Sequence, residues 1–238
     1  MNSQKLINKS VFLHDVSTIE YVKGVEYQKG LFDEIISIKS KNRKNQTSLP
    51  TKNYFIFCEH NHVYTLGKNG NNKNFLADIK TQKKIGASFH LTNRGGDITY
   101  HGPEQIVGYP IIDLENFFTD LGKYMRGIEE VIIETLSEFS IKAERSAGET
   151  GVWIDTKNNP RKICAIGVKT SRWVTMHGFA LNVNNDLSYF DHIVPCGITN
   201  KKVTSMKNEL NVDIDKSEVK RIIIKNFTKI FGMNFIVT

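Results

Sequence analysis

The amino-acid sequence predicts a chain of the α/β (α+β) class, with a mixed β-sheet flanked by helices. Segments with helical spacing of apolar residues alternate irregularly with short apolar runs typical of strands, and no internal repeat is present. The length of 238 residues is sufficient for one sizeable domain and short for two. The composition, with 39% hydrophobic residues, 17 Gly and 5 Pro, excludes a collagen-like, low-complexity or disordered chain. We therefore expect one domain over residues 1–238.

The first elements can be predicted from capping and apolar spacing. Ser17-Thr-Ile-Glu20 has the pattern of a capping box and precedes apolar residues at broadly helical spacing, which predicts a helix to about Ser40. Residues 40–53 are polar and basic and contain Pro50, so they are expected to form a mobile basic loop. The apolar run over residues 54–58 (YFIFC) then predicts a buried strand.

The second half contains the clearest helical pattern. Apolar residues recur at intervals of three and four from Leu121 to Phe139, which predicts an amphipathic helix packed on the sheet. Residues 151–154 and 162–169 are β-rich and flank the sequence DTKNNPR, whose Asn-Asn-Pro predicts a hairpin turn. A last helix is expected over residues 217–231.

The net charge of +7 is concentrated at the two ends of the chain. Residues 1–53 carry nine Lys or Arg against five acids, and residues 200–238 carry eight against four, so the middle is near neutral. Such basic flanks attract nucleic acid, an anionic membrane surface or an acidic protein. The basic runs lack interleaved aromatic residues, which argues against nucleic acid.

Targeting signals and cysteine usage indicate a cytoplasmic protein. The segment MNSQKLINKSVFLHD has no apolar signal core, and no run of about 18 apolar residues is present, so we expect neither export nor a membrane span. The three cysteines, Cys58, Cys164 and Cys196, are an odd number without zinc-type pairing. We therefore expect free thiols and no metal site.

A glycine-rich stretch from Arg94 to Pro103 (RGGDITYHGP) is the first candidate functional segment. Glycines at this density let a ligand approach the backbone closely, although a tight turn between two strands has the same composition. The stretch lacks the GK[ST] ending of a Walker A loop and the GxGxxG of a dinucleotide site. Phosphate binding is therefore weakly supported.

Lys162 and Cys196 are the other candidates. Lys162 begins an otherwise apolar strand, as either a solvated strand end or a partly buried amine with a lowered pKa. Cys196 lies between Pro195 and Gly197 in a predicted turn, as either a presented nucleophile or a small buried hydrophobe. A thiol with a pKa of about 8.5 needs a base or a positive neighbour to react at neutral pH, and Lys162 can be both. Together these residues indicate acyl transfer.

Three long motifs carry a resemblance to a known family. The sequences RGGDITYHGPEQIVGYPIIDL (94–114), RKICAIGVK (161–169) and HGFALNVNNDLSYFDHIVPCGI (177–198) closely resemble the signatures of the lipoyl(octanoyl)transferase family, also called lipoate-protein ligase B. Glu59, His60 and the VYTLG run ending at Gly67 match its upstream pattern. The resemblance covers roughly residues 10–235, with the motifs in family order.

The resemblance implies a fold and an activity. The fold would be shared with lipoate ligase and the catalytic domain of biotin protein ligase. The activity would be transfer of an octanoyl group from acyl carrier protein to a specific lysine in lipoyl domains of 2-oxoacid dehydrogenase complexes and in the glycine-cleavage H protein. The octanoyl group would arrive on the phosphopantetheine arm of the carrier. No further cofactor or nucleotide is expected, because aminolysis of a thioester is downhill. We also expect a monomer.

The resemblance further implies roles for individual residues. Cys196 would form the octanoyl thioester, and Lys162 would lower the pKa of that thiol and act as base in both half-reactions. His101 and His177 would either line the pocket and polarise the thioester carbonyl or act only as structural hydrogen-bonding groups. The substrate contacts would be Arg94, Gly95, Gly96, Asp97, Ile98, Thr99, Tyr100, His101, Ala165, Ile166, Gly167, Gly178, Phe179 and Ala180.

Two positions depart from the family pattern. Glu104 stands where glycine is common, and it is expected to add a charge beside the acyl loop and to alter partner contact. Cys164 stands where alanine is common and, two residues from Lys162, should share the face of that lysine on a regular strand. Cys58 lies in an apolar run and is expected to be inert core.

Three alternatives remain open at this point. An ATP-dependent lipoate or biotin ligase on the same fold would need a nucleotide site but no nucleophilic cysteine. A binding module that recognises lipoyl domains without catalysis would not need both Lys162 and Cys196. A cysteine hydrolase would expose the acyl group to water, which a transferase must avoid. Use of free octanoate and ATP in place of the thioester donor would identify the ligase. Absence of an acyl adduct would identify the binding module, and hydrolysis of the adduct faster than aminolysis would identify the hydrolase.

Overall fold

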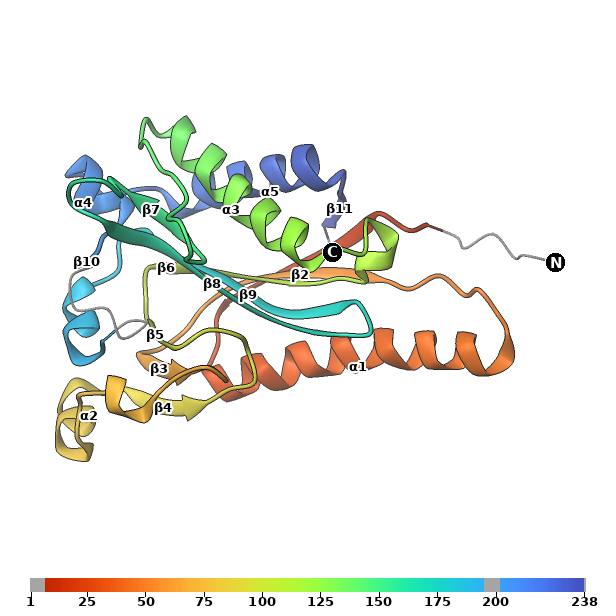
Figure 1. Cartoon of the computed structure of the whole chain (residues 1–238), viewed down its shortest axis with the longest axis horizontal. Helices are drawn as coiled ribbons and strands as arrows, with labels where there is room; N and C mark the ends of the chain where they lie inside the picture. The colour runs from red at the N-terminus through yellow and green to blue at the C-terminus, as the bar shows by residue number, and fades with distance from the viewer. Residues whose placement is uncertain (1–6, 195–201, 238) are drawn as a thin grey trace.

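Two β-sheets organise the molecule (Figure 1). Within residues 7–194 and 202–237, which the computed structural model describes, the larger sheet has eight strands. Seven follow the order β10-β8-β9-β6-β2-β1-β11, and β7 pairs with β8 beside this path. Their bounds are Ser10–Thr18 (β1), Asn53–Glu59 (β2), Gln105–Ile111 (β6), Val152–Ile154 (β7), Arg161–Ser171 (β8), Val174–Asn182 (β9), Lys202–Val203 (β10) and Asn234–Val237 (β11).

The larger sheet is mixed, as predicted. β1 is parallel to β2 and β11, and β10 is parallel to β8, whereas β2–β6, β6–β9, β8–β9 and β7–β8 are antiparallel. The strands predicted at 54–58 and 162–169 lie within β2 and β8, and the strand predicted at 151–154 is β7, which begins one residue later. The antiparallel pairing of β7 with β8 confirms the hairpin predicted at DTKNNPR.

Helices cover both faces of the larger sheet (Figure 1). α3 (Leu121–Glu138) and α5 (Lys216–Phe231) lie together on one face, and α1 (Tyr21–Asn45) lies on the other. The Phe227 ring of α5 packs against Phe55 and Phe179 of the sheet, with ring centroids 4.9 and 6.2 Å apart. The helices predicted at 121–139 and 217–231 are thus confirmed. Among the residues with described structure, no helix is both long and apolar enough to cross a membrane.

The first helix begins and ends later than predicted. Ser17 is not its cap but part of β1, with φ of +52°, because β1 pairs with β2 as far as Thr18. Glu20 is the N-cap, and its carboxylate accepts hydrogen bonds from the backbone N–H groups of Val22 and Lys23 at 3.1 and 3.4 Å. The helix continues to Asn45, so the loop expected over residues 40–53 is reduced to 46–52.

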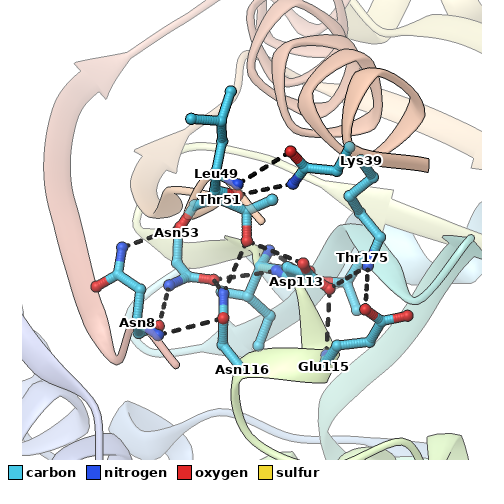
Figure 2. A network of polar contacts seen from close by, with 11 residues as sticks. Asn8, Lys39, Leu49, Thr51, Asn53, Asp113, Glu115, Asn116 and Thr175 are labelled. Atoms are coloured by element: carbon cyan, nitrogen blue, oxygen red, sulfur yellow. Dashed lines mark hydrogen bonds and ion pairs between the residues drawn. The ribbon is translucent and has the colours of Figure 1, made fainter. Parts of the chain in front are cut away.

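A buried polar network holds this connection against the sheet (Figure 2). Asp113 is fully buried and accepts hydrogen bonds from Lys39 Nζ at 2.5 Å and Thr51 Oγ1 at 2.9 Å. Its backbone N–H donates to Asn53 Oδ1 at 3.0 Å, and Asn116 donates to the same oxygen. The carboxylate therefore joins the end of α1, the connection and the end of β6.

The smaller sheet has the order β4-β3-β5 and lies at one end of the larger sheet, at the lower left of Figure 1. Its rings pack together in a core of their own, as shown by Tyr64 and Phe75 with centroids 5.0 Å apart. The remaining elements are β3 (Val63–Leu66), η1 (Asn72–Asn74), α2 (Ile79–Ile85), β4 (Ser88–Leu91), β5 (Ile98–His101), η2 (Leu114–Asn116), η3 (Leu187–His192) and α4 (Met206–Leu210).

Candidate active site

A cavity of about 390 Å³ lies between strands β8 and β9 of the larger sheet and strand β5 with its preceding loop. This volume is within the usual range of small-molecule sites, about 300–1,000 Å³. The three sequence motifs meet here although they are far apart in the chain. The predicted site residues in its lining are Arg94, Gly96, Asp97, Ile98, Thr99, His101, Lys162, Ala165, Ile166, Gly167, His177, Gly178, Phe179 and Ala180.

Two cross-strand pairs of small residues form a smooth wall of the cavity. Ala165 of β8 is opposite Ala180 of β9, and Gly167 is opposite Gly178. A Cβ on Gly167 would lie 2.8 Å from the carbonyl oxygen of Gly95, so only glycine lets the loop lie this close to β8. Gly95 itself is absent from the lining; its N–H donates to the Val168 carbonyl at 2.9 Å and ties the loop to the strand.

Arg94 shapes the glycine-rich loop from inside. Its side chain is buried, with only 8% of the residue exposed. One guanidinium nitrogen donates to Thr65 O at 2.7 Å and Thr65 Oγ1 at 2.9 Å, and the other donates to Gly95 O at 3.0 Å. Since these acceptors are parts of β3 and of the loop, Arg94 fixes the loop against the smaller sheet.

Tyr100 lies on the opposite face of β5 from the cavity, contrary to its predicted substrate contact. Side chains alternate along a strand, so Thr99 and His101 face the cavity while Tyr100 faces the core of the smaller sheet. Its hydroxyl lies 2.7 Å from His62 Nδ1, and its ring stacks on Tyr189 at 5.0 Å. The role of Tyr100 is therefore to pack the smaller sheet.

His101 and His177 are buried and held by amide groups. His101 Nδ1 lies 2.9 Å from Gln105 Oε1, and His177 Nε2 lies 2.9 Å from Asn93 Oδ1. Burial lowers the pKa of each imidazole to about 3, and for His177 the charge of Arg94 adds to this effect. Both rings are consequently neutral at pH 7 and supply no positive charge to the cavity.

Lys162 lies at the cavity wall against an aromatic ring. Its backbone pairs with Trp153 of β7, and its Nζ lies 4.6 Å from the centroid of that ring. The face of an indole packs favourably against the end of a lysine side chain, so Trp153 holds the Lys162 nitrogen at the cavity. No sequence pattern marked Trp153 as a partner of Lys162, because the pairing depends on the register of the β7–β8 hairpin.

Cys164 does not share the face of Lys162, contrary to the prediction. The register of β7 and β8 shifts here, so that the single step from Trp153 to Val152 is opposite two steps of β8, from Lys162 to Cys164. Such a bulge reverses the alternation of side chains. Cys164 is fully buried in the core, and burial raises the pKa of its thiol well above the usual range. Cys58 is likewise buried, as expected, with its thiol pKa raised by the same cause.

Cys196 lies outside the described residues. The chain before this segment is anchored by the Val194 N–H, which donates to the Asn74 carbonyl at 2.8 Å. The chain after it is anchored to β8, where the Thr204 N–H donates to the Lys162 carbonyl at 2.9 Å. Lys202 and Val203 line the cavity. The role of Cys196 thus stays a prediction.

Glu104 directly follows the glycine-rich loop, as expected, but it is not among the residues that line the cavity. It lies in the turn between β5 and β6 with φ of +68°, a conformation that glycine adopts freely. Its carboxylate lies 2.5 Å from Lys216 Nζ at the start of α5, and its N–H donates to Glu59 at 2.7 Å. The hydrogen bond from Lys216 lowers the pKa of the Glu104 carboxyl. Glu104 therefore joins this turn to α5.

Several lining residues were missed by the sequence analysis. Gln105 and Asn182 were inside quoted motifs, and the Gln105 amide donates to Asn182 Oδ1 at 2.8 Å across two strands. No grouping of three or more His, Cys, Asp or Glu suited to a metal ion is found among the described residues. The further lining residues are Tyr21, Gln105, Tyr109, Gly148, Glu149, Thr150, Trp153, Asn182, Phe190, Lys202 and Val203.

Comparison with known proteins gives the class of this catalytic domain and its family. The family model described as the lipoyl protein ligase A/B catalytic domain matches residues 36–228. A Flavobacterium johnsoniae protein named octanoyltransferase is 56% identical over 227 residues, which cover 94% of this chain and 98% of that protein. A Christiangramia forsetii octanoyltransferase is 55% identical, covering 94% and 97%. The chain belongs to the lipoyl(octanoyl)transferase family and is an acyltransferase.

Solved structures confirm the predicted fold. A bi-partite lipoate protein ligase from Thermoplasma acidophilum matches with a TM-score of 0.66 at 16% identity, covering 97% of this chain and 86% of that chain. A biotin protein ligase from Aquifex aeolicus with biotin and ATP gives a TM-score of 0.50 at 12% identity, covering 94% and 70%. At these identities the likeness concerns the fold alone.

Proposed function

We propose that this chain transfers an octanoyl group from octanoyl-acyl carrier protein to the ε-amino group of a specific lysine in lipoyl domains and H protein. The observation that carries this proposal is the cavity, where the three family motifs meet around a smooth wall with Lys162 at its edge. The octanoyltransferase relatives support the acyl group, since they cover nearly the whole chain. The transfer is the first step of protein lipoylation.

The cavity suits an unbranched acyl chain. Ala165, Ala180, Gly167 and Gly178 present no polar side chain to a ligand that lies along them. Burial of the octanoyl methylenes at about 0.8 kcal/mol each supplies several kcal/mol for binding and for selection of chain length. The neutral His101 and His177 avoid placing an unpaired charge beside that chain.

In the first half-reaction, the Cys196 thiolate attacks the carbonyl carbon of the donor thioester. A new C–S bond forms to Cys196, and the C–S bond to the carrier arm breaks. Lys162 takes the thiol proton and returns it to the departing carrier thiolate. Acyl transfer between two thiols is nearly isoenergetic, so neither nucleotide nor cofactor is required in this proposal.

In the second half-reaction, the amine of the acceptor lysine attacks the Cys196 thioester. An amide C–N bond forms, the bond to Cys196 breaks, and Lys162 carries the amine proton to the cysteine thiolate. Amines with a pKa of about 10.4 are mostly protonated at neutral pH, so this step needs the same base as the first. The contact of Lys162 with Trp153 supports the proposal because it keeps the amine at the cavity wall. The proposal retains the cytoplasmic monomer expected from the sequence.

Intact-protein mass spectrometry tests this function. Octanoyl-acyl carrier protein should add one octanoyl group to the wild type, hydroxylamine should remove it, and a lipoyl domain should accept it. Cys196→Ala should form no adduct, and Lys162→Ala should form it much more slowly. Transfer by Cys196→Ala at the wild-type rate would refute the thioester intermediate. Transfer from free octanoate and ATP alone would instead support a ligase.

A further inference from the structure

Exposed lysines and apolar residues recur over residues 68–91, in the segment before α2, in α2 and in β4 of the smaller sheet. The apolar residues are unusually exposed: Leu76 at 58%, Ile79 at 71% and Leu91 at 73%. Lys80, Lys83 and Lys84 share one face of α2 because they are three and four residues apart. We define the lysine patch as Lys68, Lys73, Lys80, Lys83, Lys84, Leu76, Ile79 and Leu91.

Within residues 7–194 and 202–237, none of the five lysines of the lysine patch forms an ion pair. The only acid between positions 68 and 84 is Asp78, which caps α2 by accepting from Thr81 N at 2.8 Å. By contrast, Lys225 and Lys229 at the basic C-terminal end pair with Glu138 and Glu134 at 3.0 and 2.9 Å. The middle of the chain, whose charges nearly cancel as a sum, therefore carries unpaired positive charge at the lysine patch.

The lysine patch is built onto the cavity wall. Asp97, which lines the cavity, accepts hydrogen bonds from Asn71 N at 3.3 Å and Asn74 Nδ2 at 2.5 Å in the segment that carries Lys73. Phe89 of β4 stacks on Phe75 of the same segment at 4.7 Å. β4 is separated from the cavity strand β5 by β3 alone, which at about 4.8 Å per strand is about 10 Å. The segment that carries Lys73 thus contacts the cavity wall, and α2 and β4 lie at the same end of the molecule as β5 (Figure 1).

We propose that the lysine patch docks the protein that carries the acyl donor, through an acidic surface with a small apolar contact. This inference rests on the proposed function. Unpaired cations spread over a helix face match carboxylates spread over a partner, and the three exposed apolar residues give such a partner an area to bury. A small anion would need a concave site, whereas these lysines lie on the outer surface.

The position of the patch favours the donor over the acceptor. An acceptor lysine has a short side chain, so its domain must come directly over the cavity. An acyl group on a long flexible arm allows its carrier to bind to one side. The lysine patch lies to that side, since β4, which carries Leu91, is two strands from β5 of the cavity wall and the segment with Lys73 contacts Asp97.

Charge reversal with a matched control tests the docking surface. The test variant is Lys80→Glu/Lys83→Glu/Lys84→Glu, and the control is Lys41→Glu/Arg43→Glu/Lys44→Glu, which has the same change in net charge. The control residues are exposed near the end of α1, about 30 Å along the helix from Tyr21 at the cavity. Initial rates are measured with octanoyl-acyl carrier protein and with octanoyl-pantetheine, a small donor without a protein surface.

The test variant should lose about tenfold in kcat/KM with octanoyl-acyl carrier protein, and the loss should shrink at high salt. Its kcat/KM with octanoyl-pantetheine and its KM for the lipoyl domain should stay within about twofold of wild type, as should all values of the control. Ile79→Ser/Leu91→Ser, which leaves the net charge unchanged, should also lower kcat/KM with octanoyl-acyl carrier protein and not with octanoyl-pantetheine.

Three results would overturn the assignment: equal losses in test and control variants, equal losses with both donors, or a raised KM for the acceptor alone. Absence of transfer from either donor by the wild type would refute the proposed function itself, which distinguishes the two failures.

Discussion

Glu129 offers a test of how the cavity wall is supported. This carboxylate is fully buried on α3, where it accepts hydrogen bonds from Gly151 N at 3.1 Å, Arg126 at 2.6 Å and Arg145 at 3.0 Å. Gly151 directly follows the cavity residues Gly148–Thr150 and precedes β7, which carries Trp153. Glu129 is thus a positioning residue that holds the wall next to Lys162.

The expected cost of Glu129→Ala follows from these contacts. The buried Gly151 N–H loses its acceptor, which costs about 1–3 kcal/mol. Arg126 and Arg145 are 51% and 38% exposed and return to water, so each contact adds only about 0.5 kcal/mol. The sum is about 3 kcal/mol, or roughly 6–12 °C in Tm for a chain of this size. Glu129→Gln keeps an oxygen for Gly151 and should lose about 1 kcal/mol.

Urea unfolding and steady-state kinetics check this reasoning. Glu129→Gln should raise KM for octanoyl-pantetheine several-fold with a smaller change in kcat, since the wall loosens while Lys162 remains. Glu130→Gln is the control, because Glu130 is on the same helix and its ion pair within residues 7–194 and 202–237 is with the surface residue Arg145. Equal stability of Glu129→Ala and the control would refute the proposed support of the wall.

Three further predictions concern separate features. Glu104→Gly should stay within about 1 kcal/mol of wild type in free energy of unfolding, because relief of a positive φ offsets the lost contact with Lys216. Glu104→Ala keeps that φ and should be about 1 kcal/mol less stable than the glycine variant. Chemical denaturation measures both values, and an alanine variant more stable than the glycine variant would contradict the prediction. Gly167→Ala should lower kcat/KM roughly tenfold, because the new Cβ displaces the loop at Gly95. Gly30→Ala is the control and should leave kcat/KM unchanged, since no atom lies within 4 Å of a Cβ there. Equal kcat/KM values for the two variants would contradict this prediction. Because the pKa of His101 and of His177 is about 3 in the folded chain, the unfolded chain binds more protons than the folded chain below pH 6.5. The free energy of unfolding should therefore fall by about 1.4 kcal/mol per pH unit for each histidine between pH 6 and 5. Urea unfolding at several pH values should show a smaller fall with pH for His177→Gln than for wild type.

Much of the fold was predictable because its signals are local. The spacing of apolar residues located α3 and α5, the apolar run located β2, and the Asn-Asn-Pro turn located the β7–β8 hairpin. The ends of α1 were mispredicted because competition between strand and helix decides them. Ser17 has the chemistry of a cap, but the pairing of β1 with β2 extends through it, and Glu20 takes its place.

The residue types at the cavity were also predictable, since motifs record which side chains are present at which spacing. Their orientations were not. One bulge turns Cys164 away from Lys162, and the alternation of β5 turns Tyr100 into the smaller sheet. Neither feature has a signature in the surrounding residues.

The sequence by itself determined the family, the α/β class and the chemical groups available for acyl transfer, because each depends on short patterns along the chain. Only the tertiary structure decided which strand faces line the cavity, that Trp153 lies against Lys162, and that the lysines near Lys80 stay unpaired among the described residues while Lys225 and Lys229 are neutralised. Strand register and ion pairing join residues far apart in sequence, and their outcome depends on packing rather than on local composition.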